Sequence, residues 1–534
     1  MVRKDMQKKI IKKELAYTII ILFVGASIFP SINGNITENH IFNRLETRVP
    51  HAVIDEAANP SIDTDWWPMF HHDILNTGFS TSEAPDTNET KWIYTASSSI
   101  FSSPAVVDGR VFVGSNGGEV YCLDADTGDK IWDYPAGSGV VSSPAISDGR
   151  VYVGCDNGKV YCLNADTGNK IWDYPTGDHV ISSPAVFDGK ILVGSYDNNM
   201  YCLDANNGSK IWDYLTGDYI LSSPAVAEGK VYFGSYDHYM YCLNIDNGSE
   251  IWRHNLGNWI RSSPAFFNGN IYVASFNRNL YCLNGENGST IWASSIGGAT
   301  DCSPAIAYGK VYICSDDDHL YCFDAYSGGE IWRYSIAEHP QWSSPAVADG
   351  KVYVGAGHYE NKIYCINANN GTEIWNYTAD DVVWSSPAIA DGRVFVGSHD
   401  DNIYCFEDPN TPPYAPTIDG ETQGHYGESY EYIFVSTDPD GDDVRYYIDW
   451  YDDQVEEWIG PYESGEEVIV SHTWEKRGIY TIKAKAKDEF DAESDWAYLE
   501  IKMPVNQQSA HPWFTWFLER FPNAFPILRN LIGI

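Results

Sequence analysis

The fold of this chain is decided by the stretch Ser102-Ser-Pro-Ala-Val-Val-Asp-Gly-Arg-Val-Phe-Val-Gly-Ser115 and its continuation Val120-Tyr-Cys-Leu-Asp-Ala-Asp-Thr-Gly-Asp-Lys-Ile-Trp132. The same unit returns seven more times at intervals of about forty residues, and a period of this length indicates a repeat architecture. Its Tyr-Cys cysteine recurs as Cys122, Cys162, Cys202, Cys242, Cys282, Cys322, Cys365 and Cys405.

Each unit has the pattern of four short strands. Apolar and β-branched runs alternate with turns that carry glycine, at Asp108-Gly109, Asn116 to Gly118 and Asp126 to Gly128. Strands joined by such turns form an antiparallel meander. Because a single four-stranded sheet leaves both faces wet, neighbouring copies must stack face to face, which predicts an all-β propeller.

The two ends of the repeat region complement each other. The eighth copy stops after its third strand at Tyr404-Cys-Phe406, and an extra strand, Lys91 to Tyr94, precedes the first copy. Placing this N-terminal strand in the last sheet closes the ring and leaves no open edge. The sequence therefore predicts an eight-bladed propeller over residues 62–408. The fourth-strand tryptophans, which we expect to dock one blade on the next, are Trp92, Trp132, Trp172, Trp212, Trp252, Trp292, Trp332 and Trp375.

One motif carries a family resemblance. Cys122-Leu-Asp-Ala-Asp-Thr-Gly-Asp-Lys-Ile-Trp132 resembles the tryptophan-docking motif of PQQ-like (quinoprotein-type) propellers, with cysteine in place of the family's first alanine. The opening Asp65-Trp-Trp-Pro-Met-Phe-His-His-Asp73 is similar to the lead-in of such propellers. The resemblance implies that the tryptophan packs against the neighbouring blade, while the aspartate and the Thr-Gly pair fix the turn. The physical chemistry agrees, since carboxylates accept amide hydrogen bonds in turns and glycine permits a positive φ.

Beyond the repeats the rhythm of the sequence changes. Residues 409–416 form a stiff proline-rich linker, and residues 417–503 alternate apolar and polar residues like the strands of a β-sandwich. Thr437-Asp-Pro-Asp-Gly-Asp442 and Gly478-Ile-Tyr-Thr-Ile482 resemble a PKD-type immunoglobulin-like domain. Trp450-Tyr-Asp-Asp453 departs from the usual turn of that domain.

Both termini carry segments that differ from the rest. Residues 1–33 place an apolar run after a basic start, which is typical of a secretory signal peptide; a run of this length could also persist as an N-terminal membrane anchor. Residues 34–61 form a polar linker. Residues 504–534 are aromatic and apolar but interrupted by prolines, and they resemble the C-terminal sorting or anchoring segments of some archaeal exported proteins. The alternative is that this last segment packs on the preceding domain.

The net charge and the positions of the cysteines limit the partners and the disulfides that are possible. The formal net charge of −40 argues against nucleic acid and anionic membrane surfaces as partners. Eight of the eleven cysteines occupy one equivalent position in eight blades, and blade spacing exceeds the Cα separation of about 7 Å that a disulfide can bridge. Cys155, Cys302 and Cys314 depart from the repeat and offer no evident pair. We therefore expect the cysteines to be small buried apolar residues.

No catalytic motif stands out. The sequence has no Gly-x-Ser-x-Gly elbow, no His-Glu-x-x-His zinc motif and no phosphate-binding Gly-x-x-x-x-Gly-Lys-Ser/Thr loop. Quinoprotein dehydrogenases use this scaffold with an adjacent cysteine pair and inserted loops that carry calcium ligands and a catalytic aspartate, and the nearly uniform repeats offer neither. We therefore expect no bound PQQ, no catalytic residue and no cofactor-binding residue.

The copies differ most on one face. The Asp-Gly and Thr-Gly turns are nearly constant and share one side of the ring, whereas the loops on the opposite side vary. Loops on a rigid scaffold are where binding usually resides, and exposed Trp, Tyr and Arg are the commonest anchors. The candidate ligand-binding or partner-binding residues of this face are Arg261, Asp301, Trp342, Trp384, Trp259, Tyr236, His238, Arg278, His319 and His358. The alternative is that the tryptophans plug the channel mouth and the other loops are merely solvated.

An acidic loop raises the question of calcium. Asp438, Asp440 and Asp442 alternate in a loop that contains a glycine, and their carboxylates are hard oxygen ligands of the kind that Ca²⁺ prefers. The loop lacks the glutamate that completes an EF-hand, so a plain solvated turn is the alternative. No other cofactor is expected.

These observations predict a secreted or cell-surface protein, attached to the envelope or free, that is a monomer and meets the membrane only through its terminal segments. Its expected role is non-catalytic binding or scaffolding, with a protein or glycan partner at the cell envelope. The propeller lipoprotein of bacterial outer-membrane assembly, which the repeat region resembles in architecture, is a precedent. The alternative is a PQQ-dependent dehydrogenase.

Overall fold

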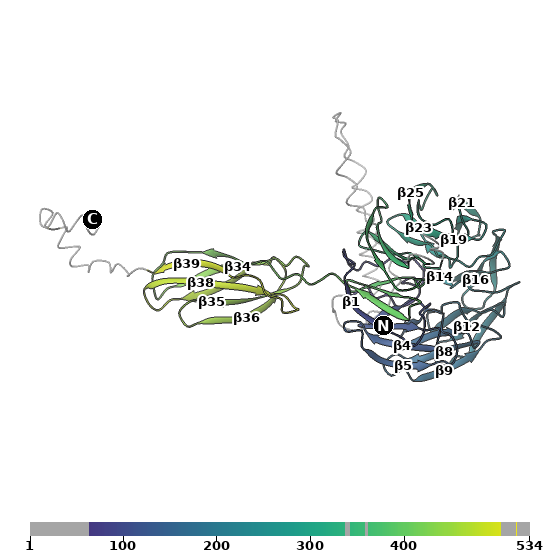
Figure 1. Cartoon of the computed structure of the whole chain (residues 1–534), viewed down its shortest axis with the longest axis horizontal. Coiled ribbons are helices and arrows are strands. Elements are labelled where there is room, and N and C mark those ends of the chain that lie inside the picture. The colour runs from purple at the N-terminus through teal and green to yellow at the C-terminus, as the bar shows by residue number, and fades with distance from the viewer. Residues whose placement is uncertain (1–63, 337–341, 358–360, 504–519, 521–534) are drawn as a thin grey trace, which may run out of the picture. The chain divides into compact units, whose positions relative to one another are not determined.

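The computed structural model describes residues 64–336, 342–357, 361–503 and 520 (Figure 1). The chain divides into the units Met1–Asp63 and Thr64–Ile534, and every described residue belongs to the second. The predicted signal segment, the 34–61 linker, nearly all of the C-terminal segment and His358 lie outside the described residues. Within the described ranges, no helix has the length and apolar composition that a membrane span requires.

Between Thr90 and Phe406 the described chain forms eight four-stranded antiparallel sheets. The innermost strands are β2 (Ala105–Val107), β6 (Ala145–Ser147), β10 (Ala185–Phe187), β14 (Ala225–Ala227), β18 (Ala265–Phe267), β22 (Ala305–Ala307), β26 (Ala346–Ala348) and β30 (Ala388–Ala390). The second strands are β3 (Arg110–Gly114), β7 (Arg150–Cys155), β11 (Lys190–Gly194), β15 (Lys230–Gly234), β19 (Asn270–Ser275), β23 (Lys310–Ser315), β27 (Lys351–Gly355) and β31 (Arg393–Gly397). The third strands are β4 (Glu119–Asp124), β8 (Lys159–Asn164), β12 (Asn199–Asp204), β16 (Tyr239–Asn244), β20 (Asn279–Asn284), β24 (His319–Asp324), β28 (Lys362–Asn367) and β32 (Asn402–Phe406). The outermost strands are β1 (Thr90–Thr95), β5 (Lys130–Pro135), β9 (Lys170–Pro175), β13 (Lys210–Leu215), β17 (Glu250–Asn255), β21 (Thr290–Ser295), β25 (Glu330–Ser335) and β29 (Glu373–Thr378).

The ring closes where the sequence predicts. β1, from the N-terminal side, pairs antiparallel with β32 and places Trp92 opposite Cys405, the register that Trp132 and Cys122 have in the first sheet. The second serine of each Ser-Ser-Pro or Cys-Ser-Pro motif accepts a hydrogen bond from the equivalent serine amide of the preceding sheet, from Ser103 and Ser143 through to Ser386 and back to Ser103. This circle satisfies buried amides that innermost strands of three residues cannot pair. The predicted all-β propeller completed by an N-terminal strand is confirmed.

The docking tryptophans join neighbouring sheets as the resemblance implied. The Trp132 indole N–H donates to the carbonyl oxygen of Ala165 in the next sheet at 2.9 Å, and the ring covers the turn glycine Gly168. Seven of the eight tryptophans are at most 9% exposed, and Trp292 is partly buried. Trp375 instead donates to the Pro85 carbonyl of the lead-in, so the segment before β1 replaces the turn that the eighth copy lacks.

The lead-in segment crosses the ring. Its residues from Trp67 to Gly78 make backbone hydrogen bonds to β2, β6, β14, β18, β22 and β26. Asp73 holds the turn in this segment, because its carboxylate accepts from the amides of Leu75 and Thr77. His71 of the same segment is buried, and burial lowers the pKa of its imidazole to about 4. The segment therefore ties most of the propeller to one stretch of chain.

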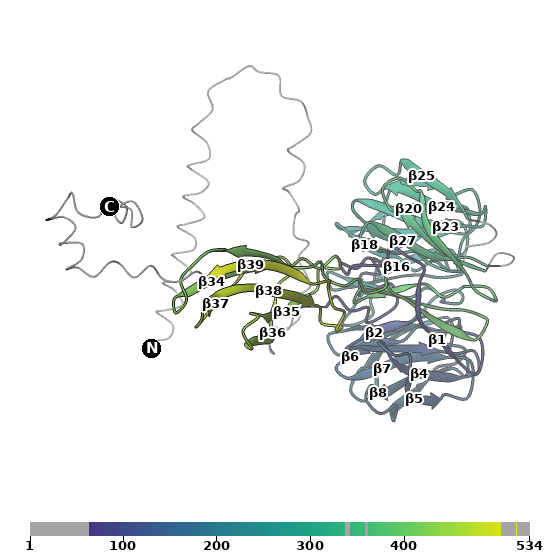
Figure 2. The ribbon, with the colours of Figure 1, turned by 60° about the vertical axis from the view of Figure 1, so that its left-hand side comes forward.

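The C-terminal strands form a separate two-sheet sandwich (Figure 2). One sheet has the order β33-β34-β37 and the other β36-β35-β38-β39. Trp450, Trp474, Tyr432 and Tyr446 are fully buried between them. The strands are β33 (Thr417–Gly420), β34 (Ser429–Val435), β35 (Val444–Asp449), β36 (Val455–Tyr462), β37 (Val468–Thr473), β38 (Gly478–Lys487) and β39 (Ala497–Met503). The predicted sandwich is thus present.

Candidate functional site

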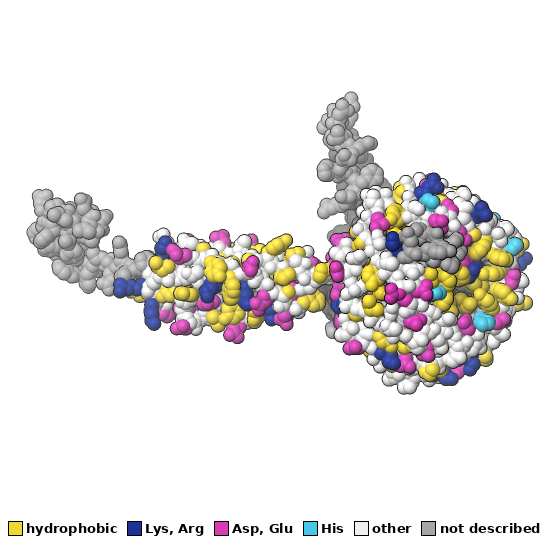
Figure 3. All heavy atoms as spheres, viewed as in Figure 1, with side chains coloured by type: hydrophobic (Ala, Val, Ile, Leu, Met, Phe, Trp, Pro, Cys, Tyr) yellow, Lys and Arg dark blue, Asp and Glu magenta, His cyan; other side chains and the backbone are white. Residues whose placement is uncertain are grey.

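The variable loops meet on one side of the propeller. In successive sheets the turn between the second and third strands bonds to the loop that enters the sheet: the Tyr236 amide donates to the Tyr219 carbonyl and the Phe276 amide to the Trp259 carbonyl, both at 3.0 Å. Within the described ranges, the nearly constant Asp-Gly and Thr-Gly turns form hydrogen bonds with each other and not with these loops, as in the bond from the Ala125 amide to the Gly109 carbonyl. Figure 3 shows hydrophobic side chains gathered on a face of the propeller, beside acidic and histidine side chains.

A row of aromatic rings runs along this side. Tyr196 and Tyr219 stack with centroids 4.8 Å apart and planes within 10°, and Tyr236 and Trp259 stack at 5.2 Å and 10°. Tyr219 contacts Tyr236 at 6.1 Å, and Trp259 contacts Phe276 at 5.7 Å, so the five rings are continuous. Trp259 is 44% exposed and Tyr219 41%. We call these five residues the aromatic row.

A second aromatic group, the tryptophan cluster, contains Trp342, Trp384, Phe101 and His399. Trp342 and Trp384 stack at 5.4 Å, and Phe101 contacts both Trp384 and His399. Burial lowers the pKa of His399, which keeps this edge of the cluster uncharged at neutral pH. Trp342 remains 38% exposed.

Arg261 joins the two groups. Its guanidinium carbon lies 4.4 Å from the Trp342 ring centre and 5.9 Å from that of Tyr236, within range of a cation–π interaction. One guanidinium nitrogen is 2.8 Å from Asp301 Oδ2. Burial raises the pKa of Asp301 to about 7, against the lowering effect of Arg261, and Asp316 adds to the increase. Among the described residues none donates a hydrogen bond to Asp301 Oδ1. With its side chain only 7% exposed, Asp301 holds the Arg261 guanidinium in place between the two aromatic groups.

The structure brings together six of the predicted binding residues: Arg261, Asp301, Trp342, Trp384, Trp259 and Tyr236. His238 and Arg278 lie in the turns between second and third strands, where they take positive φ values of 78° and 69°, and His319 is the first residue of the third strand β24. Tyr196 and Tyr219 were missed by the sequence analysis. They stand one repeat before Tyr236 and Trp259, and this equivalence was the available signal.

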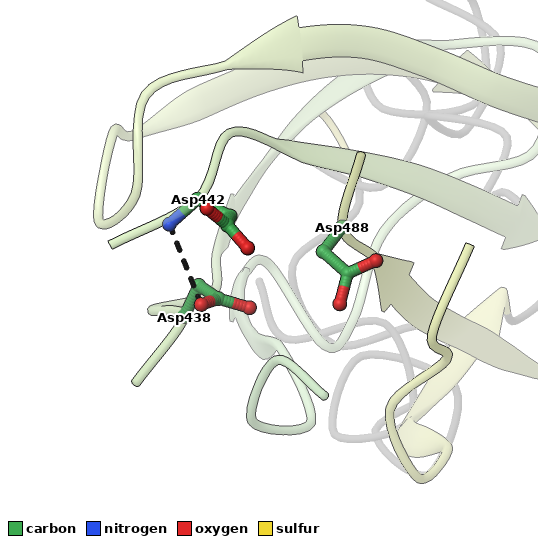
Figure 4. A group of neighbouring side chains, drawn as sticks. All are labelled: Asp438, Asp442 and Asp488. Carbon is green, nitrogen blue, oxygen red and sulfur yellow. Dashed lines mark hydrogen bonds between the residues drawn. The ribbon is translucent and has the colours of Figure 1, made fainter. Parts of the chain in front are cut away.

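The acidic loop of the sandwich forms a different group from the one predicted (Figure 4). Carboxylate oxygens of Asp438, Asp442 and Asp488 all lie within 4.8 Å of one another. Asp440 is exposed, and its carboxylate accepts from the Thr411 amide at 2.5 Å, so Asp488, which follows β38, takes the place predicted for Asp440. Alternation along one loop could not reveal a residue that arrives from another strand.

Burial and mutual repulsion make the ionised form of these carboxylates unfavourable. Burial and the neighbouring Asp438, Glu489, Asp440 and Asp488 raise the pKa of Asp442 to about 6. Asp438 is 6% exposed, and its Oδ2 accepts no hydrogen bond from any residue that the structure describes. A divalent cation among these oxygens would relieve both features.

The sheets, the docking tryptophans and the crossing lead-in define a class, the β-propellers built from PQQ-like repeats. The chain belongs to the family described as outer membrane protein assembly factor BamB, whose sequence model matches residues 80–181, 156–257, 237–341 and 316–410. No protein among the curated sequences matches the chain.

Solved structures of other propellers share the fold of the repeat region. BamB from Moraxella catarrhalis is 17% identical, with a TM-score of 0.54 over 60% of this chain and 99% of that chain. Quinohemoprotein alcohol dehydrogenase from Comamonas testosteroni is 16% identical, with a TM-score of 0.55 over 67% of this chain and 83% of that chain. The PKD domain of an M14-like peptidase from a Thermoplasmatales archaeon is 56% identical, with a TM-score of 0.18 over 18% of this chain and 99% of that chain.

Proposed function

We propose that this chain is an exported or cell-surface binding protein, without catalytic activity, that uses the variable loop side of its propeller to hold a protein or glycan partner. Residues 417–503 then serve as a PKD-type spacer, and the terminal segments direct export and attachment. The observation that carries the proposal is the Arg261–Asp301 pair held between the aromatic row and the tryptophan cluster.

The chemistry of this side favours a partner with apolar faces and hydrogen-bonding groups. Asp301 pairs with the Arg261 charge, so the pair adds little attraction for a strongly anionic ligand. Trp259, Tyr219 and Trp342 are each more than a third exposed, so their rings offer apolar surface against which sugar C–H groups, proline rings or peptide planes can pack. Aromatic residues and arginine at the centre of a rigid surface are the usual anchors of an interface.

A quinone-dependent dehydrogenase is the alternative function, because such enzymes share the fold. The residues at the channel mouth do not fit the cofactor site that the resemblance implies. Of the described residues around Arg261, Asp301 supplies the carboxylate, and it is committed to that arginine. Adding pyrroloquinoline quinone with calcium is expected to give neither bound quinone absorbance nor dye-linked alcohol oxidation.

Replacing Trp259 and Trp342 together with alanine tests the binding role. Loss of two exposed anchors is expected to weaken partner binding at least thirtyfold, about 2 kcal/mol, while the melting temperature stays close to that of the parent. Binding is measured by capture from envelope fractions and on immobilised glycans. Tyr326→Ala is the matched control, since Tyr326 is 61% exposed and lies in a turn on the opposite side. Equal capture by all three proteins would reject the proposal.

We further propose that Asp438, Asp442 and Asp488 hold a calcium ion. Removing calcium with a chelator is expected to lower the melting temperature of the sandwich by roughly 5 °C or more, because the three carboxylates then repel one another. Affinity should fall as pH drops through about 6, where Asp442 takes up a proton. Asp488→Asn should abolish the calcium effect and Asp440→Asn should preserve it. A melting temperature that does not respond to chelator would favour the plain turn.

A further inference from the structure

The sixth sheet departs from the other sheets at two positions that touch. In six sheets the first serine of Ser-Ser-Pro accepts a hydrogen bond from the amide of the small residue twelve positions later. These pairs are Ser142 with Gly154, Ser182 with Gly194, Ser222 with Gly234, Ser262 with Ala274, Ser343 with Gly355 and Ser385 with Gly397. In the sixth sheet both members are cysteine, and the Cys314 amide donates to Cys302 Sγ at 3.2 Å.

Most of the equivalent positions have no room for a side chain, although the fifth sheet has Ala274 there. At Gly154 an added Cβ would lie 2.5 Å from Cγ1 of Val180, and at Gly234 it would lie 2.2 Å from Cγ2 of Ile260. A side chain is therefore excluded at these equivalent positions, whereas Cys314 fits with no exposed surface. Cysteine in place of serine at position 302 would by itself keep the usual hydrogen bond from the amide at position 314. That change therefore does not explain why position 314 is also a cysteine.

The two thiols face each other inside the sheet. Cys302 and Cys314 are both fully buried, and Cys302 Sγ lies 3.2 Å from the backbone nitrogen of Cys314. Burial, together with the neighbouring Cys302 thiol, raises the pKa of Cys314. The other nine cysteines lie elsewhere: eight of them occupy the third strands of the eight sheets, one in each, and Cys155 lies in β7.

We propose that Cys302 and Cys314 form an intrachain disulfide in the mature protein. The bond forms by exchange with an oxidised dithiol catalyst or a small-molecule disulfide. The two cysteine thiols give up two protons and two electrons, one S–S bond forms, and the S–S bond of the oxidant breaks to give two thiols. The proposal rests on the export included in the proposed function, because such bonds persist in oxidising compartments. Since Cys302 directly follows Asp301, the bond also fixes the loop before β22 that carries the binding-site carboxylate.

Thiol counting on the full chain tests the pairing. The chain is refolded in a glutathione redox buffer, unfolded, and alkylated before and after reduction. Nine of the eleven cysteines should react at once and two only after reduction, and peptide mapping should find Cys302 joined to Cys314. The same two cysteines should be protected in protein collected from the outside of the producing cells. The melting temperature of the oxidised chain should exceed that of the reduced chain by roughly 5 °C.

Two variants act as matched controls. Cys302→Ser restores the residue of most other sheets and should leave all ten remaining thiols reactive, with melting independent of reductant. Cys155→Ser should retain the protected pair, because Cys155 is a buried departure whose thiol donates instead to the Ser138 carbonyl. Eleven reactive thiols in the oxidised wild-type chain, or a bond to any other cysteine, would overturn the proposal. Partner binding is not measured, so failure of the proposed function leaves this result unaffected.

Discussion

Replacing Trp212 with alanine is expected to lower the free energy of unfolding of the propeller by about 3–5 kcal/mol. Trp212 is 7% exposed and packs between its own sheet and the next, where its indole N–H donates to the Ile245 carbonyl at 2.9 Å. The alanine variant would leave a cavity at this junction together with an unpaired buried carbonyl. The measurement is urea unfolding with calorimetry of the propeller transition. Trp212→Phe, which keeps most of the apolar volume, should cost less than half as much.

Two glycines of the neighbouring sheet separate the contact of this tryptophan from backbone strain. Gly248 and Gly229 have φ values of +68° and +73°. An added Cβ at Gly248 would lie 2.7 Å from the Trp212 ring, whereas at Gly229 nothing lies within 4 Å. Gly229→Ala should therefore cost about 1 kcal/mol from backbone strain alone, and Gly248→Ala at least twice that. Equal costs would show that the tryptophan does not press on the turn.

The ring of sheets could be predicted from the sequence because each repeat has the same pattern of strand and turn residues. The spacing of Trp132 from Cys122 sets the register between the third and fourth strands of the first sheet, and every copy has nearly the same spacing. The pairing of Trp92 with Cys405, 313 positions apart, could therefore be predicted from the number of strands. The lead-in was recognisable as a motif, but its path across six innermost strands was not. Nothing in a local pattern says where a segment without repeats will run.

The candidate sites were predictable only in part, for a related reason. Arg261, Asp301 and Trp342 stood out as departures from the repeat, and the structure brings them together. Tyr196 and Tyr219 did not stand out, because a tyrosine in a surface turn is ordinary until its neighbour stacks on it. Asp488 and the Cys302–Cys314 contact depend on the register between strands, which the sequence analysis did not use for these residues.

The second large effect concerns the ion pair that anchors the lead-in. His72 Nε2 lies 3.0 Å from Asp65 Oδ1, and its Nδ1 lies 3.8 Å from Asp73 Oδ2. Burial alone would lower the pKa of His72, but Asp65 and Asp73 outweigh it and raise the pKa to about 9. Burial would likewise raise the pKa of Asp65, yet the hydrogen bond and charge of His72 and the bonds from Thr81 hold it well below its usual range. The imidazolium, whose side chain is 12% exposed, is thus charged and paired at neutral pH.

Asp65→Asn is expected to lower the free energy of unfolding by about 3–5 kcal/mol at pH 7, because it leaves this largely buried charge without its main partner. The pH dependence has a definite sign. In the parent chain the folded state binds more protons than the unfolded state between about pH 6.5 and 9, so the His72 contribution is complete below pH 6.5 and is lost as pH rises through 9. The Asp65 contribution is present above about pH 4 and is lost on acidification below it.

Melting temperatures between pH 3 and pH 10 check both limbs. The difference in melting temperature between the parent and Asp65→Asn should be largest from about pH 4 to 6.5 and should shrink on each side of that range. Asp133→Asn is the matched control, since Asp133 pairs with Lys130 at 2.7 Å with both side chains about 40% exposed, and its loss should cost less than about 1 kcal/mol. A profile of Asp65→Asn that runs parallel to the parent would mean that His72 is neutral in the folded chain. The lead-in would then be held by its backbone hydrogen bonds, by the Asn76 side-chain amide, which donates to the Ser223 and Pro264 carbonyls, and by the buried Trp67.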